Sequence, residues 1–354
     1  MNDRDVSREL IEQVATSHAN ATPLRITGGD SKSFLGCRFE GEVLDVGAHS
    51  GIVEYEPDEL VLSARAGTRL TEIEAELSRH GQMLGFEPPR HAPSATIGGT
   101  LASNVSGPAR PWLGSVRDAV LGIRLINGRG EHMRFGGRVI KNVAGFDVSR
   151  LQAGAFGALG VVTEISLKVL PKPEASSTWR FVVDARSAVR RMNELAGTRL
   201  PLTGAAWLDG SLYLRLAGAA SAVAAAGSAL GGEQIEEAFW TSLRDQRLEI
   251  FTAPDERPLW RLSVKPTSDA LLEDDTLVMD WGGAQRFVRA TAELSEMSEI
   301  ARRAGGYAMR MTTNGANSEF IQQPGRDLRA LHERLKQAFD PARILNRGRL
   351  YGWL

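Results

Sequence analysis

The first half of the chain alternates short apolar runs with breaks that contain glycine or proline. Val, Ile and Leu gather in runs at residues 24–27, 43–46, 52–56, 60–66, 120–125 and 161–169. Short runs of this kind between turn-forming residues predict β-strands. From Leu70 to Leu77 the apolar residues recur at helical spacing, which predicts a helix over 68–80 with a capping box of Thr71 and Glu74. Mixed short strands and helices indicate an α+β domain.

A change in composition at residues 171–177 (PKPEASS) indicates a domain boundary, because it follows a β-branched run that ends at Leu170. Beyond it, the pattern predicts a second α/β domain with antiparallel hairpins. Strands are expected at 179–183, 205–208, 212–216, 260–264, 277–281 and 307–311, and helices over 185–196, within the Ala-rich 216–232 and within 285–303.

Charge and cysteine content exclude several classes of protein. With 42 Lys+Arg and 43 Asp+Glu the net charge is −1, whereas a general nucleic-acid binder needs a basic surplus. The single cysteine, Cys37, excludes a disulfide framework, a Cys-ligated iron–sulfur cluster and a Cys-rich zinc site. The charged N-terminus has no apolar core of a secretory signal, and the uncharged run at 216–232 is short and weakly hydrophobic. We therefore expect neither a signal peptide nor a membrane span.

The loop at 27–33 (TGGDSKS) is the first candidate site. Its two glycines can adopt positive φ, and consecutive backbone N–H groups can then point into one concavity, which suits a pyrophosphate. A plain Gly-Gly turn explains the same residues. The chain contains neither a Walker loop nor G-x-G-x-x-G, so an ordinary Rossmann site has no support.

Two more glycine-rich segments are candidates. In 88–104, a proline-rich approach leads to Gly98 and Gly99, where backbone can lie close to a flat ring system, and Ser103 and Asn104 can bond its polar edge. The alternative is a helix N-terminus capped by Thr96. In 138–163, small residues permit close packing, or the backbone of 160–162 pairs with an adenine.

The C-terminal tail completes the pattern. Alone, FDPARILNRGR at 339–349 indicates a terminal turn that closes a domain. The four segments together, in this order, resemble the vanillyl-alcohol-oxidase or p-cresol-methylhydroxylase (PCMH) type of FAD-binding family, with Arg347 where the family usually has proline. The resemblance is closest to the FAD-binding subunits of glycolate oxidase, on KNVAGFD at 141–147, GAFGALGVVTE at 154–164 and WGGAQ at 281–285.

The resemblance implies a two-subdomain PCMH-type FAD-binding domain at 1–170, a cap domain at 171–335, and a C-terminal segment at 336–354 that returns to the FAD domain. It also implies non-covalent FAD, since the first loop carries Asp30 where a histidine often makes the covalent bond, and Cys37 lies outside the usual later loop. The implied cofactor-binding residues are Thr27, Gly28, Gly29, Asp30, Ser31, Lys32, Ser33, Thr96, Gly98, Gly99, Ser103, Asn104, Gly160, Val161, Val162, Asn346 and Arg349.

Catalytic residues are harder to assign. In related D-2-hydroxy-acid dehydrogenases, the substrate domain supplies histidines that bind a metal and that abstract the proton of the substrate hydroxyl. Here the histidines lie at 18, 49, 80, 91, 132 and 332, so residues 133–331 lack this base and metal ligand. We therefore expect no metal site. Arg261 and Arg310, on predicted strands, are candidate carboxylate clamps, although a solvated strand face or an interdomain salt bridge explains them more simply.

The resemblance thus implies an FAD-binding subunit of a glycolate oxidase (dehydrogenase) complex, which takes part in oxidising glycolate to glyoxylate and in passing electrons from flavin to an acceptor. The resemblance implies a sister FAD subunit and an iron–sulfur subunit as partners. Two alternatives remain: a self-contained FAD-dependent D-2-hydroxy-acid dehydrogenase, and a structural subunit that keeps the flavin fold without redox duty. We expect a cytoplasmic protein without a direct membrane span, able to associate with the inner membrane through partner subunits.

Overall fold

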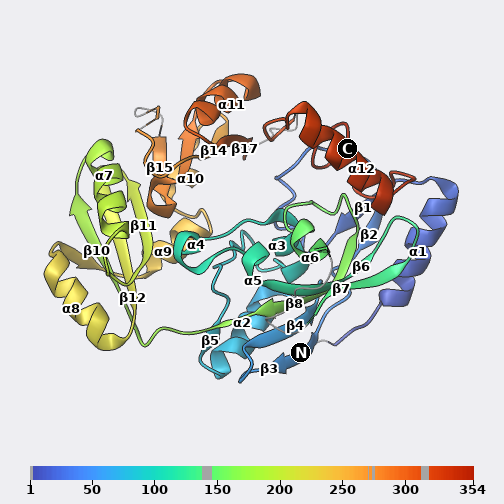
Figure 1. Cartoon of the computed structure of the whole chain (residues 1–354), viewed down its shortest axis with the longest axis horizontal. Helices are drawn as coiled ribbons and strands as arrows, with labels where there is room; N and C mark the ends of the chain where they lie inside the picture. The colour runs from blue at the N-terminus through green and yellow to red at the C-terminus, as the bar shows by residue number, and fades with distance from the viewer. Residues whose placement is uncertain (1–2, 138–145, 270, 273–275, 312–318) are drawn as a thin grey trace.

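Two antiparallel sheets, one from each half of the chain, organise this computed structural model, which describes residues 3–137, 146–269, 271–272, 276–311 and 319–354 (Figure 1). The expected mixture of strands and helices in both halves is confirmed. In Figure 1 the first sheet lies at the lower right, and the second extends from the left to the top.

The first sheet has the strand order β3 (Ile52–Glu56), β4 (Val61–Arg65), β8 (Val161–Lys168), β6 (Val120–Ile126) and β7 (His132–Gly136). Around it lie α1 (Ser7–Asn20), the parallel pair β1 (Leu24–Thr27) and β2 (Glu42–Asp45), the short antiparallel pair β5 (Gln82–Met83) and β9 (Leu170–Pro171), and the helices α2 (Leu70–Arg79), α3 (Ile97–Ser103), α4 (Arg110–Leu113), α5 (Val116–Ala119) and α6 (Val148–Leu151).

One hydrophobic core holds this half together. The apolar stripe of α2, which includes Ile73, packs with Leu101 of α3 against buried strand residues such as Leu62 and Ile165. The predicted helix is therefore confirmed, but its capping box is wrong. Helix α2 begins at Leu70, so Thr71 lies inside the helix and is not its N-cap residue, and the carboxylate of Glu74 pairs with Arg90.

The second sheet has the strand order β13 (Glu233–Ile235), β10 (Ala175–Val182), β12 (Ser211–Gly218), β11 (Leu202–Leu208), β15 (Thr276–Asp280), β16 (Gln285–Arg289), β14 (Leu259–Ser263) and β17 (Tyr307–Arg310). Its helices are α7 (Ala185–Ala196), α8 (Ala220–Leu230), α9 (Ala238–Arg244), α10 (Glu249–Thr252) and α11 (Leu294–Arg303), and the 3₁₀ turn η1 (Trp281–Gly283) joins β15 to β16. The antiparallel hairpins expected here extend across the whole sheet.

Alternation along each strand gives this sheet two distinct faces. On the outer face, Trp260 and Val288 pack with α11, while Met279 packs with α7 and α8. On the inner face, Phe287 and Met309 join α9, α10 and residues of the first half, among them Leu35, Cys37 and Val105. The inner face therefore meets the first half of the chain.

The C-terminal segment returns to the first half, as the resemblance implied. After α12 (Arg326–Phe339), the Ile344 carbonyl oxygen accepts a hydrogen bond from the Leu24 N–H at 2.7 Å, and Leu345 forms a parallel bridge to Leu24. A buried ion pair between Lys336 and Asp340, at 2.8 Å, fixes this turn. Within the described residues, no helix has both the length and the apolar character needed to span a membrane.

Candidate functional site

A cavity forms where the loop after β1, the start of α3, the loop before β8 and the C-terminal tail converge. Its empty space is about 920 Å³, including an opening to solvent. Most of the cofactor-binding residues implied by the sequence lie here together. Those that line the cavity are Thr27, Gly28, Gly29, Asp30, Ser31, Lys32, Ser33, Thr96, Gly98, Gly99, Ser103, Gly160, Val162, Asn346 and Arg349.

The glycines of the first loop are needed for space. Positive φ occurs at Asp30 (51°) and not at Gly28 or Gly29, so the expected conformational reason for these glycines is wrong. A Cβ atom on Gly29 would lie 1.6 Å from the Ser94 carbonyl oxygen, and one on Gly28 would lie 2.9 Å from Thr96 Oγ1. The loop therefore lies directly against the segment that precedes α3.

Lys32 brings an unneutralised cation to the cavity wall. Its Nζ atom is buried and has no hydrogen-bond partner among the described residues. Burial lowers the Lys32 pKa to about 8, and the carboxylate of Asp245 only partly opposes this. Nearby, the side-chain Nε2 of Gln152 is also buried and unpartnered within the described structure. Buried donors of this kind require an acceptor, so the cavity suits an anionic polar ligand.

The start of α3 combines the two roles that the sequence left open. Thr96 caps the helix, because its Oγ1 accepts a hydrogen bond from the Gly99 N–H at 3.2 Å, and both residues also line the cavity. A Cβ atom on Gly98 would lie 2.8 Å from Ala66, so this helix packs closely against the end of β4.

Two residues implied by the sequence do not line the cavity. Asn104 is the C-terminal cap residue of α3, with a φ of 49°, and its buried Oδ1 has no partner in the described part of the chain. Val161 is fully buried in the core of the first half, because strand alternation turns it away from the cavity that Gly160 and Val162 line.

The tail forms one wall of the cavity. The Oδ1 atom of Asn346 accepts a hydrogen bond from the Ile26 N–H at 2.8 Å, and its Nδ2 donates to the Phe156 carbonyl oxygen at 2.6 Å. Arg349 donates to the carbonyl oxygens of Ser33 at 3.0 Å and Cys37 at 3.2 Å. Both side chains thus tie the tail to the cavity loops.

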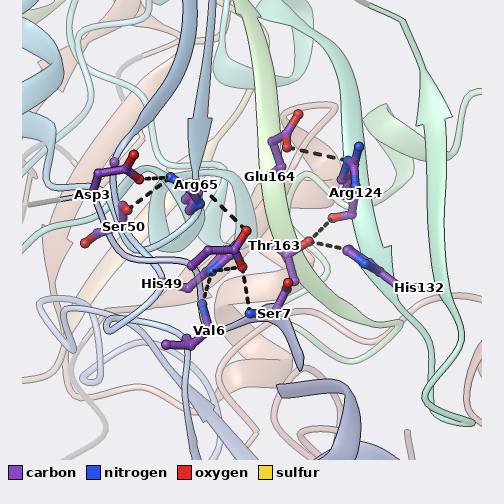
Figure 2. Close-up of polar contacts among 12 residues, drawn as sticks. Asp3, Val6, Ser7, His49, Ser50, Arg65, Arg124, His132, Thr163 and Glu164 are labelled. Atoms are coloured by element: carbon purple, nitrogen blue, oxygen red, sulfur yellow. Dashed lines mark hydrogen bonds and ion pairs between the residues drawn. The ribbon is translucent and has the colours of Figure 1, made fainter. Parts of the chain in front are cut away.

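A polar cluster fastens the start of the chain beside the cavity. Figure 2 shows Asp3 and Val6 facing His49 and Arg65. The Nδ1 atom of His49 accepts a hydrogen bond from the Val6 N–H at 3.1 Å, and burial lowers the His49 pKa. Arg65 pairs with Asp3 and directly precedes Ala66, which lines the cavity. This cluster therefore has a structural role.

A second histidine, His132, also forms a hydrogen bond within the first half of the chain. Thr163, the residue after Val162, forms a hydrogen bond with Nε2 of His132 at 2.9 Å (Figure 2). All six histidines fall within the described residues, and none lines the cavity.

Known proteins resemble this chain along its whole length. The family described as FAD binding domain matches residues 6–136. The glycolate oxidase subunit GlcE of Escherichia coli (strain K12) is 46% identical over 356 residues, which cover 100% of both chains. The chain belongs to the GlcE family. As a GlcE-family protein it is an FAD-dependent oxidoreductase subunit, and the expectations of an FAD cofactor and a PCMH-type fold are confirmed.

A more distant relative matches this GlcE-family chain in part. The glycolate oxidase subunit GlcD of Bacillus subtilis (strain 168) is 33% identical over 144 residues, or 40% of this chain and 30% of that protein. Among solved structures, an alkyldihydroxyacetonephosphate synthase aligns with a TM-score of 0.66 at 15% identity, covering 96% of this chain and 75% of the other. This last likeness shows the fold alone.

The cavity of this GlcE-family chain fits FAD. Its wall holds the ammonium of Lys32, which has no hydrogen-bond partner in the described part of the chain and suits a negatively charged pyrophosphate. The loop at 27–33 lines the cavity and has no room for a side chain at Gly29, because its backbone lies directly against Ser94. Among the residues that the structure describes, no three His, Cys, Asp or Glu side chains come together as a metal site.

The two arginines predicted as carboxylate clamps do not lie together. Arg261 is 5% exposed on the inner face of the second sheet, where its Nε has no partner among the described residues. Arg310 lies on the outer face, with its guanidinium 5.6 Å from the ring centroid of Trp260. One carboxylate therefore cannot bind to both.

Sequence reasoning missed a small hollow around Arg261. Its empty space is about 320 Å³, including space open to solvent, and its lining includes Ser106, Asp280 and Gln285. Burial raises the pKa of Asp280 to about 7. The hollow adjoins the FAD cavity through one loop, because Ser103 lines the cavity and Ser106 lines the hollow. Only the placement of Arg261 on a predicted strand pointed to it.

Proposed function

We propose that this chain is the FAD-binding subunit of a glycolate oxidase complex, where it takes part in oxidising glycolate to glyoxylate and in moving electrons from flavin to an acceptor. The observation that carries the proposal is the 46% identity to a glycolate oxidase subunit over the full length of both chains. The Lys32 ammonium, without a hydrogen-bond partner among the described residues and beside a glycine-lined loop, supports a phosphate-bearing cofactor in this cavity.

FAD, when bound, supplies the redox chemistry, and the chain supplies binding, orientation and exclusion of water. In this proposal, Lys32 and the backbone of residues 27–33 hold the pyrophosphate, the start of α3 adjoins the flavin ring, and the backbone at Gly160 and Val162 adjoins the adenine. Asn346 and Arg349 close the site by holding the tail against its loops.

The cofactor is proposed to bind without a covalent bond. The first loop carries Asp30 in place of a histidine. The thiol of Cys37 is 5% exposed, and burial raises its pKa, so the nucleophilic thiolate is disfavoured there.

The partners are proposed to be a sister FAD subunit and an iron–sulfur subunit. One cysteine cannot ligate an iron–sulfur cluster, so a cluster route for electrons requires another chain. The relatives GlcE and GlcD are both named as glycolate oxidase subunits. The chain is proposed to associate with the inner membrane through these partners.

The visible spectrum of the purified chain, before and after anaerobic addition of glycolate, tests the proposal. We expect flavin bands that persist with glycolate and bleach once the sister subunits are added. Bands that bleach with glycolate alone would instead indicate a self-contained dehydrogenase. Absence of flavin bands after reconstitution with FAD, together with stable assembly into the complex, would indicate a structural subunit.

A further inference from the structure

The segment of residues 3–6 is attached to the first half of the chain at His49 (Figure 2). The Nδ1 atom of His49 accepts a hydrogen bond from the Val6 N–H at 3.1 Å, and a backbone N–H can only donate, so this ring nitrogen carries no proton. Beside it, the backbones of Arg4 and Ser50 exchange hydrogen bonds of 2.9 and 3.0 Å. The contact with Val6 therefore requires a neutral imidazole that keeps its proton on Nε2.

The surroundings of His49 keep the ring neutral. Burial has the largest effect, and it lowers the His49 pKa below the ordinary histidine value of about 6.5. Among the nearby charges, the Asp5 carboxylate, 3.6 Å from Nδ1, and Glu164 on β8 act to raise this pKa, whereas Arg65 and His132 act to lower it. The imidazole is therefore uncharged at pH 7.5 and above.

Short chains of hydrogen bonds join His49 to the wall of the FAD cavity. The His49 N–H donates to the carbonyl oxygen of Val46 at 3.0 Å, and Val46 lines the cavity. The Val46 N–H donates in turn, at 2.8 Å, to the carbonyl oxygen of Thr27, where the first cavity loop begins. On the other side, the His49 carbonyl oxygen accepts from the Gly67 N–H at 2.8 Å, and the neighbouring Ala66 lines the cavity. A displacement of His49 therefore reaches two parts of the cavity wall.

We propose that His49 is a pH-sensitive switch, which holds residues 3–6 beside the FAD cavity while its ring is neutral and releases them when the ring is protonated. A proton on Nδ1 converts this atom from an acceptor into a donor, so it can no longer bind the Val6 N–H and can donate to the Asp5 carboxylate instead. Release of the segment removes a support of the cavity wall, and FAD is then held less tightly. The switch does not depend on the reaction that the complex catalyses.

Hydrogen exchange of the full purified chain without FAD tests the switch. Once residues 3–6 detach, His49 meets water and titrates near pH 6.5, so the contact is fully stabilising above that pH and weakens as the pH falls. Between pH 8 and pH 5, opening should become up to about 30-fold more favourable. After correction for the intrinsic rate of exchange, we expect the amides of residues 4–6 to lose protection by up to that factor, while the amides of β8 keep theirs. His91 does not interfere, because burial lowers its pKa to about 4.

His49→Asn is the informative variant, because its amide oxygen can accept the Val6 hydrogen bond and does not titrate. Protection of residues 4–6 in this variant should not depend on pH. His80→Gln is the matched control, since this exposed histidine lies at the C-terminal end of α2, 3.7 Å from Glu76, and it should keep the pH dependence of the parent. A flat pH profile in the parent, the same profile in His49→Asn, or a joint loss of protection in β8 would overturn the switch.

The effect on the cavity is measured separately, as the rate at which FAD fluorescence appears after dilution of the loaded chain. In the parent this rate should be about 3- to 10-fold higher at pH 5 than at pH 8, whereas in His49→Asn it should be equal at the two pH values. Acid release of residues 3–6 without faster loss of FAD would overturn the link to the cavity. A chain that binds no FAD would overturn the cofactor assignment together with that link, and exchange without FAD would still decide the switch itself.

Discussion

Gly29 is the cavity residue at which an added side chain would have the least room. In Gly29→Ala the new Cβ would lie 1.6 Å from a backbone oxygen, that of Ser94, so the loop and the segment before α3 must separate. We expect at least a ~10-fold loss of FAD affinity, measured by fluorescence titration, since the cavity lies between these two segments. Gly325→Ala is the control, because no atom lies within 4 Å of its Cβ position and its φ is −61°. Full flavin occupancy in Gly29→Ala would contradict the role of this loop.

Asp280 should make the stability of the protein depend on pH. It is 2% exposed, and burial raises its pKa to about 7, so the folded state holds the proton more tightly than the unfolded state. Its contribution to the free energy of unfolding is therefore fully present below pH ~4, the unfolded pKa, and is lost as the pH rises through 7.

Urea unfolding of Asp280→Asn measures this contribution. Between pH 4 and pH 8, the stability of the variant relative to the parent should rise by up to about 4 kcal/mol, the equivalent of some three pKa units. Asp184→Asn is a useful contrast: hydrogen bonds from Ser187 lower the pKa of this exposed carboxyl, so its effect on pH dependence has the opposite sign. Identical pH profiles for the parent and Asp280→Asn would rule out a raised Asp280 pKa.

At the scale of secondary-structure elements, the local sequence pattern predicts an element correctly where residues close in sequence determine its bounds. Helix α7 has the predicted bounds because its apolar periodicity and its N-cap, Asp184, are both local. The predicted capping box of α2 is wrong because the helix begins at Leu70, before Thr71, and the carboxylate of Glu74 pairs with Arg90, sixteen residues away. The opposite faces of Arg261 and Arg310 depend on strand register and on α11, and neither can be read from a single strand.

The turn after α12 depends on a buried ion pair that the sequence does not reveal. The Nζ of Lys336 donates to the carbonyl oxygens of Ala158 and Leu345, each at 2.8 Å, and pairs with Asp340. Lys336→Met would leave the fully buried Asp340 carboxylate without its cation, at a cost of about 3–5 kcal/mol.

Denaturant unfolding and the rate of FAD loss report on this turn. Because the turn carries Asn346 to the cavity, Lys336→Met should also release FAD faster. Lys168→Met, at an exposed position of β8, should change neither quantity appreciably. Parent-like stability in Lys336→Met would show that the ion pair is dispensable.

At the scale of the whole molecule, polar contacts between residues far apart in sequence join the two halves. Asp245 accepts a hydrogen bond from the Arg90 N–H at 3.0 Å. Glu87 pairs with Arg215 at 2.8 Å and accepts a hydrogen bond from the Ala109 N–H at 2.9 Å. The composition and the motifs predict the two halves and most of the cavity lining, but they carry no information about the contacts of Asp245 with Arg90 and of Glu87 with Arg215. The hollow around Arg261, which lies between the halves, was missed for that reason.

Glu87→Gln tests whether these contacts couple the halves. The amide keeps the shape of the side chain but leaves the Arg215 guanidinium, whose side chain is 12% exposed, without its carboxylate. We expect a loss of about 1–3 kcal/mol in the free energy of unfolding, whereas Glu299→Gln, at an exposed helical pair, should have little effect.

Glu87→Gln has a second consequence, because the negative charge of Glu87 helps to raise the Asp280 pKa. Glu87→Gln should therefore move the pH midpoint of the Asp280 effect downward, and an unmoved midpoint would show that the two carboxyls are not coupled across the contact between the halves.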